Sequence, residues 1–396
     1  MGWTRLLRVR RLPARDVRAH PTPPTDAGLV VPTALLALVA ALVLKVSLLP
    51  LSNTDMTEYA LGWLAATRER GVAVLGDEVT DYAPAYSYLL LIAALVPDWV
   101  KPLTAVKLIS LAGDLVLAAL AGLLVQALGG GRMRALVAVA VVFALPTVLI
   151  NGSVWGQTDA IWTSALLAAL LAMLHGRAAA ASLLVGLAFA YKPQAAFFGP
   201  ILLAFLLAQR QPHWLVLLPV PYLLLALPPL LAGRSAASVF GVYVAVFGSL
   251  DEVSYDAPGL WTWLQAAGVD PDRAVLPGLL VAAAAGAGLT VLALRGACRR
   301  LQGQGLLVGA ALSCSLLPFL TPKTMGRYFF AAEVILALLA CLNPLLLPAV
   351  IASQTAALLA YEPFLLGLIN WRVPLAVLFE AFAILLVLRL WLRSRA

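Results

Sequence analysis

Long apolar runs separated by short polar turns dominate the pattern of this chain. A helix that crosses a bilayer needs about 20 apolar residues. Twelve runs approach this length, at residues 29–50, 103–128, 134–150, 158–175, 178–191, 194–209, 213–232, 275–295, 303–320, 328–342, 345–361 and 373–393. The pattern therefore predicts an all-α polytopic membrane protein with about 12 transmembrane helices, within a range of about 10 to 13 because several runs are short.

One further apolar run, at residues 83–96, is too short to interpret from its length alone. Cytoplasmic loops of membrane proteins carry an excess of arginine and lysine, so the basic turns indicate the orientation. If residues 83–96 do not span, the basic turns share one side with the N-terminus: Arg5, Arg8, Arg10, Arg11, Arg15, Arg18, Arg132, Arg134, Arg177, Arg210, Arg295, Arg299, Arg300, Arg389, Arg393 and Arg395. We therefore expect a short helix at the outer surface here, and both termini in the cytoplasm.

The composition changes this picture by excluding soluble classes of protein. Of the 396 residues, 62% are hydrophobic and 12% are charged, whereas soluble domains carry about 25% charged residues. The net charge of +8 is expected from basic cytoplasmic loops, so nucleic acid is not a predicted partner. Three cysteines and three histidines are scattered along the chain and predict neither a disulfide framework nor a histidine-based metal site.

The charges also divide the chain into regions. Residues 1–28, rich in arginine and proline, are expected to form a disordered cytoplasmic tail, and residues 29–393 a single transmembrane domain. Two long stretches, at residues 51–101 and 233–274, are expected to lie outside, the first as juxtamembrane helices. Most of the acidic residues fall on this outer side. A structural protein has no evident need for that asymmetry, whereas a site that opens to the outer face does.

Polar residues gather where the predicted spans meet the outer face. Asp55 follows the first span by a few residues, and a carboxylate at that boundary can act as a general base. Alternatively, Asp55 caps the helical stretch at residues 56–70, since aspartate is favoured at helix N-caps. The segment that begins with Asp81 and Tyr82 has the pattern of a turn and a helix start, and its tyrosines suit an interfacial belt.

A third polar cluster, at residues 151–159, joins two spans and faces outward. Trp155 can stack on a sugar ring, and Gln157 and Asp159 can form hydrogen bonds with sugar hydroxyls. The structural alternative for this cluster is an interfacial tryptophan followed by an aspartate at a helix N-cap.

Two further clusters carry cations at the same boundary. Lys192 precedes Pro193, which breaks a helix, and a lysine at this depth either works in a site or extends its side chain to the surface. Lys323 and Arg327, followed by Tyr328, stand where a lipid phosphate can bind, and the planar fork of arginine suits phosphate oxygens. Interfacial anchoring is the alternative for these two cations.

Five charged residues lie within predicted spans: Lys45, Lys107, Asp114, Glu333 and Glu380. Lys107 and Asp114 are two helical turns apart and therefore share one helix face. Glu333 lies one to two turns from Arg327, close enough to pair with it.

Taken in order, these motifs resemble the GT-C superfamily of integral-membrane glycosyltransferases, and more narrowly the prokaryotic proteins related to GPI-anchor mannosyltransferases. The resemblance covers roughly residues 50–330. The matching residues are Asp55; Asp81, Tyr82 and Pro84; Trp155, Gly156, Gln157 and Asp159; Lys192, Pro193 and Gln194; and Lys323, Arg327 and Tyr328. The chain departs from the family pattern where Ala83 precedes Pro84 in place of Pro-Pro, and where Met325-Gly326 replaces a His-Glu pair.

The resemblance implies an inverting transfer of a sugar, with mannose favoured, from a polyprenyl-phosphate donor to the hydroxyl of a glycan, lipid or protein acceptor. It also implies roles for particular residues: Asp55 as catalytic base; Glu58, Asp81 and Tyr82 for the acceptor or for support; Trp155, Gln157 and Asp159 for the donor sugar; and Lys192, Lys323, Arg327 and Tyr328 for the donor phosphate. No cofactor is firmly expected. Some GT-C enzymes use a divalent metal, which Asp55 and Glu58 would share here.

A secondary transporter or flippase of a lipid-linked or small polar substrate is the main alternative, because twelve spans fit that class. Transporters, however, tend to place polar groups near the midplane, often in two similar halves, and no internal repeat is evident. An inactive homologue or lipid-binding scaffold is favoured only by Met325-Gly326, and an acyltransferase or ligase is disfavoured by the lack of a well-placed histidine. Abundant alanine, leucine and arginine with little lysine suggest a bacterial inner-membrane protein.

Overall fold

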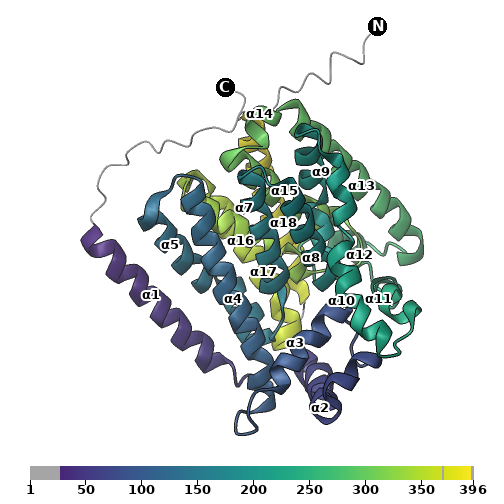
Figure 1. Ribbon diagram of the computed structural model, residues 1–396. Helices are drawn as coiled ribbons and strands as arrows, with labels where there is room; N and C mark the ends of the chain where they lie inside the picture. The colour runs from purple at the N-terminus through teal and green to yellow at the C-terminus, as the bar shows by residue number, and fades with distance from the viewer. Residues whose placement is uncertain (1–26, 368–369, 394–396) are drawn as a thin grey trace.

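The computed structural model describes residues 27–367 and 370–393, which form a bundle of helices (Figure 1). The predicted N-terminal tail lies almost entirely outside these residues. Up to the middle of the chain the elements are α1 (Ala27–Leu48), η2 (Asp55–Ala60), α2 (Leu61–Arg70), η3 (Gly71–Gly76), α3 (Pro84–Ala94), α4 (Pro102–Ala127), α5 (Gly131–Ala144), α6 (Pro146–Leu149), η4 (Ile150–Trp155), α7 (Asp159–Leu174), α8 (Ala178–Tyr191), η5 (Pro193–Phe198) and α9 (Gly199–Ala208).

The second half continues the same all-helical pattern, with one pair of very short strands. Its elements are η6 (Pro212–Leu217), α10 (Val220–Leu231), α11 (Ala236–Gly248), β1 (Ser254–Tyr255), α12 (Leu260–Ala266), α13 (Pro271–Arg295), α14 (Ala297–Arg300), α15 (Gly303–Leu320), β2 (Thr324–Met325), η7 (Gly326–Phe329), α16 (Phe330–Ala340), η8 (Pro344–Leu346), α17 (Leu347–Leu366), η9 (Asn370–Arg372) and α18 (Val373–Arg393).

Within the described residues, seven helical segments are long and apolar enough to cross a membrane: α1, α4, η6 with α10, α13, α15, η8 with α17, and α18. The bent pair formed by α5 and the α6–η4 segment makes an eighth if it counts as one span, and α3, α7, α8, η5 with α9, and α11 are shorter apolar helices. The predicted class, an all-α polytopic membrane protein, is confirmed. The count of about 12 spans stays a prediction.

Prolines break the apolar helices at two places that matter for the site. A proline lacks the backbone N–H, and it pushes the preceding residue into an extended conformation. Leu145, before Pro146, is extended, and the two helical segments that meet there are bent by 52°. Lys192, before Pro193, is extended as well, at the junction of α8 and η5. Both breaks interrupt regular helix next to polar residues.

The core of the bundle surrounds α16, in which every residue is buried. Close helix packing contributes strongly to association in lipid, where small residues let backbones approach. Gly113 of α4 faces Ile161 of α7, and a Cβ atom at this glycine would lie 2.8 Å from the isoleucine side chain. Gly122 of α4 faces Val139 of α5 in the same way. α1 lies at the periphery, with most of its side chains exposed toward lipid.

The two long stretches between spans are mostly helical. The first holds η2, α2, η3 and α3, so helices are observed where they were predicted, including a short one within residues 83–96, while their juxtamembrane position stays a prediction. The second holds α11 and α12, and its strand β1 pairs in parallel with β2, Ser254 with Thr324 and Tyr255 with Met325. In Figure 1, α2 and α3 lie at the end of the bundle opposite α14.

The charges inside the bundle pair differently from the sequence expectation. Asp114 of α4 forms a buried ion pair with Lys45 of α1, with 2.8 Å between Nζ and Oδ2. Lys107 shares a helix with Asp114 but bonds only to backbone carbonyls. Glu333 does not pair with Arg327, and both of its carboxylate oxygens lack a hydrogen-bond partner. Pairing of Glu333 with Arg327 is therefore wrong, because α16 directs the glutamate into the core.

Candidate functional site

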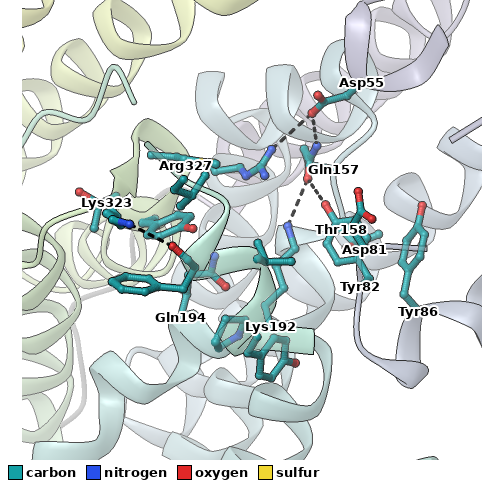
Figure 2. Close-up of a pocket in the computed structure, with 18 of the residues that line it drawn as sticks. Asp55, Asp81, Tyr82, Tyr86, Gln157, Thr158, Lys192, Gln194, Lys323 and Arg327 are labelled. Carbon is teal, nitrogen blue, oxygen red and sulfur yellow. Dashed lines mark hydrogen bonds and ion pairs between the residues drawn. The ribbon is translucent and has the colours of Figure 1, made fainter. Parts of the chain in front are cut away.

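A cavity of about 590 Å³ opens among the segments that break the regular helices (Figure 2). It is lined by residues from η2 and α2, from residues 81–86, 156–158 and 192–197, from the end of α11, and from residues 321–328. Eight residues that the sequence analysis singled out line it: Asp55, Asp81, Tyr82, Gln157, Lys192, Lys323, Arg327 and Tyr328. Polar residues from distant parts of the chain thus meet in one place.

Asp55 is the carboxylate at the centre of this polar group. Its Oδ2 atom accepts hydrogen bonds from Trp155 Nε1 at 2.8 Å and from Gln157 Nε2 at 2.9 Å. Arg327 Nη1 lies 3.5 Å from the same oxygen. The alternative role as a helix cap is wrong, because Asp55 is the first residue of η2 and the preceding Thr54 occupies the cap position without a side-chain bond.

Gln157 links this carboxylate to the opposite side of the cavity. Its Oε1 atom accepts hydrogen bonds from Tyr82 Oη and Lys192 Nζ, each at 3.2 Å, while its Nε2 atom donates to Asp55. The two donors fix which end of the amide faces which neighbour. Figure 2 shows Gln157 between Asp55 and Lys192. A single amide therefore connects an acid, a cation and a phenol.

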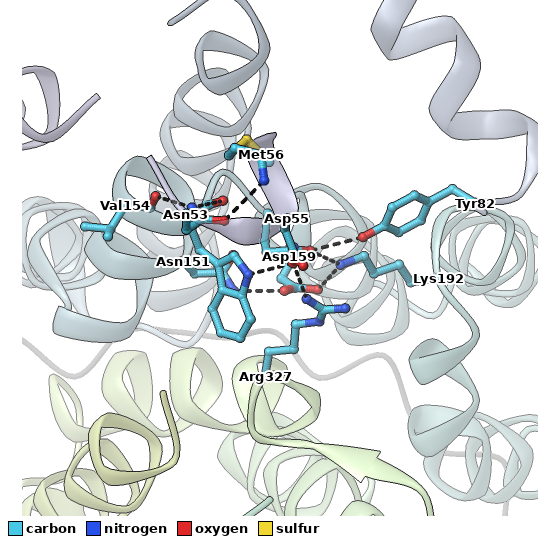
Figure 3. A network of polar contacts seen from close by, with 11 residues as sticks. Asn53, Asp55, Met56, Tyr82, Asn151, Val154, Asp159, Lys192 and Arg327 are labelled. Atoms are coloured by element: carbon cyan, nitrogen blue, oxygen red, sulfur yellow. Dashed lines mark hydrogen bonds and ion pairs between the residues drawn. The ribbon is translucent and has the colours of Figure 1, made fainter. Parts of the chain in front are cut away.

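Lys192 is held by Asp159 in a buried ion pair, with 2.7 Å between Nζ and Oδ1 (Figure 3). The Asp159 carboxylate also accepts hydrogen bonds from Asn151 Nδ2 and Trp162 Nε1, each at 2.8 Å. Snorkelling of Lys192 to the surface is therefore wrong, since its side chain is almost completely buried and lies over the Tyr82 ring.

Asp159 and Trp155 do not line the cavity, although a direct role at the donor sugar was expected of both. Asp159 is 1% exposed and lies behind Lys192. The Trp155 ring stacks on Phe364 at a centroid distance of 4.8 Å and meets the edge of Tyr361 at 5.2 Å. With Arg327 also over the ring, no free face remains for a sugar. Both residues position the cavity residues instead.

Arg327 is largely buried beside Asp55, and its guanidinium lies 5.2 Å from the centre of the Trp155 ring. Its Nε atom has no hydrogen-bond partner. Burial by itself lowers the pKa of this guanidinium, but Tyr82, Asp159 and Asp55 raise the pKa further than burial lowers it. Arg327 therefore carries a full positive charge and an unused N–H donor.

Lys323 is the third cation of the cavity and belongs to the segment that joins α15 to β2. Its backbone has a positive φ of 58°, and its N–H donates to Val253 O at 2.7 Å. Its Nζ atom lies over the Phe247 ring at 5.1 Å and donates to the carbonyl of the same residue at 3.3 Å. Lys323 therefore carries its charge to the place where the polar lining gives way to apolar side chains.

Lys107 supports the cavity from behind, a role that the sequence analysis missed. Its Nζ atom donates to the carbonyls of Leu51, Ser153 and Val154. Asn53 Nδ2 donates to Val154 O at 2.9 Å and to the next carbonyl along η4. These bonds fasten the segment before Asp55 to the segment before Gln157. A lysine inside an apolar run was the available signal, but its partners were not predictable.

Two glycines are required by this geometry. Gly156 has a φ of 79°, a left-handed conformation that glycine adopts without strain. A Cβ atom there would lie 2.7 Å from the sulfur of Met56. Gly326, in the Met325-Gly326 departure from the family pattern, packs on α17, where a Cβ atom would lie 2.9 Å from Ala360. The structure therefore leaves no room for a side chain at Gly326.

Glu58 is not brought to the site. Its side chain is exposed, and it is not among the residues that line the cavity. Within residues 27–367 and 370–393, no group of three or more histidine, cysteine, aspartate or glutamate side chains is arranged to hold a metal ion. Asp55 thus has Trp155, Gln157 and Arg327 as neighbours rather than a second carboxylate.

Apolar side chains line the cavity at and just after the end of α11 and on α13, with Val244, Phe247, Leu250 and Leu279. A second, apolar cavity of about 390 Å³ runs between η5–α9 and α13 and shares Phe197 and Thr321 with the first. Small residues line its α13 side: Ala282, Ala283, Gly286 and Ala287. The apolar cavity thus lies next to the polar one, along α13, and is separated from it by Phe197 and Thr321, which line both.

Comparison with protein-family models and with curated protein sequences finds no match for this chain.

Proposed function

We propose that this protein is an inverting glycosyltransferase that moves a sugar, with mannose favoured, from a polyprenyl-phosphate donor to an acceptor hydroxyl. One observation carries the proposal: a single cavity brings a partly exposed carboxylate together with three cations, and an apolar cavity lies beside it. A lipid-linked phosphosugar has the matching parts, namely a hydrocarbon chain, an anionic phosphate and a polar ring. The ordered motifs that resemble the GT-C superfamily support the same class of reaction.

The donor phosphate binds in this proposal at Arg327 and Lys323, with Lys192 deeper in the cavity. Arg327 lines the cavity and supplies a planar fork that suits phosphate oxygens. Tyr328 adds a hydroxyl to the same wall. Cations held in place before the reaction stabilise the charge that develops on a departing phosphate. A phosphate is a stable leaving group, so no general acid is required.

The hydrocarbon chain of the donor extends along the second cavity in this proposal. That groove is lined by apolar and small side chains, with Phe197 and Thr321 at the junction with the polar cavity. A water-soluble nucleotide sugar would leave this surface unused. Each buried methylene contributes about 0.8 kcal/mol, so a long chain adds affinity without further polar contacts.

Asp55 acts as the general base. Its contacts with Trp155, Gln157 and Arg327 converge on Oδ2, which leaves Oδ1 to accept the proton of the acceptor hydroxyl. The acceptor oxygen forms a bond to the anomeric carbon on the side opposite the phosphate, and the bond from that carbon to the phosphate oxygen breaks. The polyprenyl phosphate leaves with the electron pair, and the anomeric configuration is inverted.

The arginines support an orientation for this site. Arg295 ends α13 and Arg299 lies in α14, at the end of the bundle opposite α2 and α3 (Figure 1). The positive-inside rule assigns that end to the cytoplasm. The cavity then faces outward, which fits transfer at the outer surface of a bacterial inner membrane.

The proposal is tested with purified full-length protein in lipid nanodiscs. A set of polyprenyl-phosphate sugars is offered with candidate acceptors, and products are read by mass spectrometry, while polyprenyl-phosphate binding is measured separately. Arg327→Ala is expected to weaken that binding by about 1.5–3 kcal/mol, the usual value of a charged hydrogen bond. Arg273→Ala is the control, because the Arg273 side chain is 89% exposed and does not line the cavity.

Unchanged binding by Arg327→Ala would remove the arginine from the phosphate site. If the wild-type protein moves the intact lipid-linked sugar across liposome membranes and transfers no sugar, the transporter alternative holds and the proposal is wrong.

A further inference from the structure

We infer that the cavity wall formed by Tyr59, Trp63, Tyr82, Tyr86 and Asp81 is a carbohydrate-binding subsite that holds the acceptor as an uncharged sugar. This inference rests on the proposed function, because it takes Asp55 as the group that accepts the acceptor's proton. It goes further by choosing one class among glycan, lipid and protein acceptors.

The four aromatic rings form one cluster on the cavity wall. Trp63 lies at its centre, with ring-centroid distances of 5.9 Å to Tyr59 and 5.8 Å to both Tyr82 and Tyr86. The Tyr82 and Tyr86 rings are 4.6 Å apart. All four line the same cavity. Two separate segments of the chain, η2–α2 and residues 82–86, therefore build a single aromatic surface.

This wall lies across the cavity from Arg327 and Lys323, whereas Lys192 lies over the ring of Tyr82. In Figure 2, Asp81, Tyr82 and Tyr86 lie on one side of Gln157, whereas Arg327 and Lys323 lie on the other. Arg327 and Lys323 thus form one end of the cavity, suited to a phosphate, and the four aromatic rings with Asp81 form the other. An acceptor and a donor can occupy the two ends at the same time.

An aromatic belt at the membrane interface does not account for this arrangement. Belt residues place their rings at the headgroup level around the outside of a protein. Trp99, which follows α3 and is 85% exposed, has that character. Tyr86 is 4% exposed, and Trp63 is partly buried and turned toward the other rings. Tyr59 is 44% exposed and lines the same cavity, so the cluster offers part of its surface to an occupant of that cavity.

The chemistry of the wall matches a sugar ring. A pyranose presents apolar C–H groups on its faces, which pack on aromatic rings, and hydroxyl groups around its rim, which donate to carboxylates. Asp81 is exposed at the cavity and forms no ion pair or hydrogen bond with any described residue. Its negative charge disfavours an acceptor that carries a phosphate or carboxylate close to the reacting hydroxyl.

The wall is connected to the base by two hydrogen bonds. Tyr82 Oη donates to Gln157 Oε1 at 3.2 Å, and Gln157 Nε2 donates to Asp55 Oδ2 at 2.9 Å. A sugar packed against Tyr82 and Trp63 would therefore present a rim hydroxyl toward Asp55.

The test measures ligand binding by full-length protein in nanodiscs, without donor. The probes are methyl α-mannoside, methyl α-glucoside, methyl β-galactoside and a serine-containing tripeptide, followed by saturation-transfer NMR. We expect at least one glycoside to bind and the peptide not to bind. Trp63→Ala should weaken that binding tenfold or more, by about 1.4 kcal/mol, and Asp81→Asn should weaken it as well. Trp99→Ala should leave it unchanged.

Polyprenyl-phosphate binding by the same variants shows that Trp63→Ala is folded and keeps the inference separate from the proposed function. The inference is overturned if no glycoside binds while polyprenyl phosphate does, if the peptide binds in place of the glycosides, or if Trp63→Ala and Trp99→Ala have equal effects. Glycoside binding without any polyprenyl-phosphate binding would support the subsite and overturn the proposed donor. Conservative Trp63→Phe should restore part of the glycoside affinity.

Discussion

Replacing Asp159 by alanine tests whether this residue holds Lys192 or contacts the donor sugar. The carboxylate is buried and accepts hydrogen bonds from Lys192, Asn151 and Trp162. Removing one partner of a buried ion pair costs about 3–5 kcal/mol, because the other charge stays buried and unpaired. Each additional donor left unsatisfied costs about 1–3 kcal/mol. We therefore expect Asp159→Ala to lower the free energy of unfolding by several kcal/mol.

A double-mutant cycle separates this role from a direct contact with the sugar. Lys192→Met should also destabilise the protein, because it leaves the Asp159 carboxylate buried without its cation. The double variant removes both charges, and replacement of a buried pair by apolar groups is often close to neutral. The double variant should therefore be more stable than the sum of the single effects predicts, with a coupling energy of about 0.5–3 kcal/mol.

Unfolding can be followed in detergent with a thiol-reactive dye. Cys314 is buried and reacts only as the bundle opens, whereas exposed Cys298 and partly buried Cys341 are first replaced by serine to lower the background. Apparent melting temperatures then rank the variants. A melting temperature of Asp159→Ala equal to that of the parent protein, or additive single effects, would refute the assignment of Asp159 as the partner of Lys192.

Three changes elsewhere test the surroundings of the cavity. Ala283→Phe should block the apolar groove and lower transfer from long-chain donors about tenfold, which equals the loss of about two buried methylenes. Transfer from short-chain donors should be unaffected. Ala284→Phe is the control in the long-chain and short-chain transfer assays. Gly326→Ala should lower the melting temperature, since overpacking costs about 1–3 kcal/mol, whereas Gly288→Ala, with nothing within 4 Å of its Cβ, should not. Lys107→Met should lower kcat more than it lowers polyprenyl-phosphate affinity, and the reverse order would contradict its role in positioning the base.

The helices were predictable because an apolar run of near-spanning length in lipid satisfies its backbone hydrogen bonds by forming a helix. The short run at residues 83–96 does form a helix, α3. The number of spans was less predictable, since α7, α8 and α16 are shorter than a bilayer is thick at regular helical rise. Length and composition do not decide whether such a helix crosses, because its neighbours determine its depth.

The location of the candidate site followed from the cost of charge in lipid. Polar residues at the ends of spans are expensive unless they work together, and Asp55, Lys192 and Arg327 indeed meet in one cavity. Their roles were less predictable. Residue type alone did not show that Trp155 and Asp159 turn away from the cavity, because the direction of a side chain depends on the local backbone.

Contacts between distant segments were beyond the sequence pattern. Helical periodicity placed Lys107 and Asp114 on one face, yet Asp114 pairs with Lys45 of another helix. Tyr59 and Trp63 stand four residues apart and therefore share a face, which was a usable signal for half of the aromatic wall. The tertiary packing that adds residues 82–86 was not visible in that spacing.

The most direct test of the central claim is the rate of sugar transfer by Asp55→Asn from a polyprenyl-phosphate sugar. Asparagine can still accept hydrogen bonds from Trp155 and Gln157 but cannot accept the acceptor's proton, so kcat should fall by about 10²- to 10⁴-fold with donor binding retained. Asp98→Asn, which changes an acid that is 97% exposed, should transfer sugar at the wild-type rate. Wild-type turnover by Asp55→Asn would contradict the assignment of Asp55 as the base and the mechanism built on it.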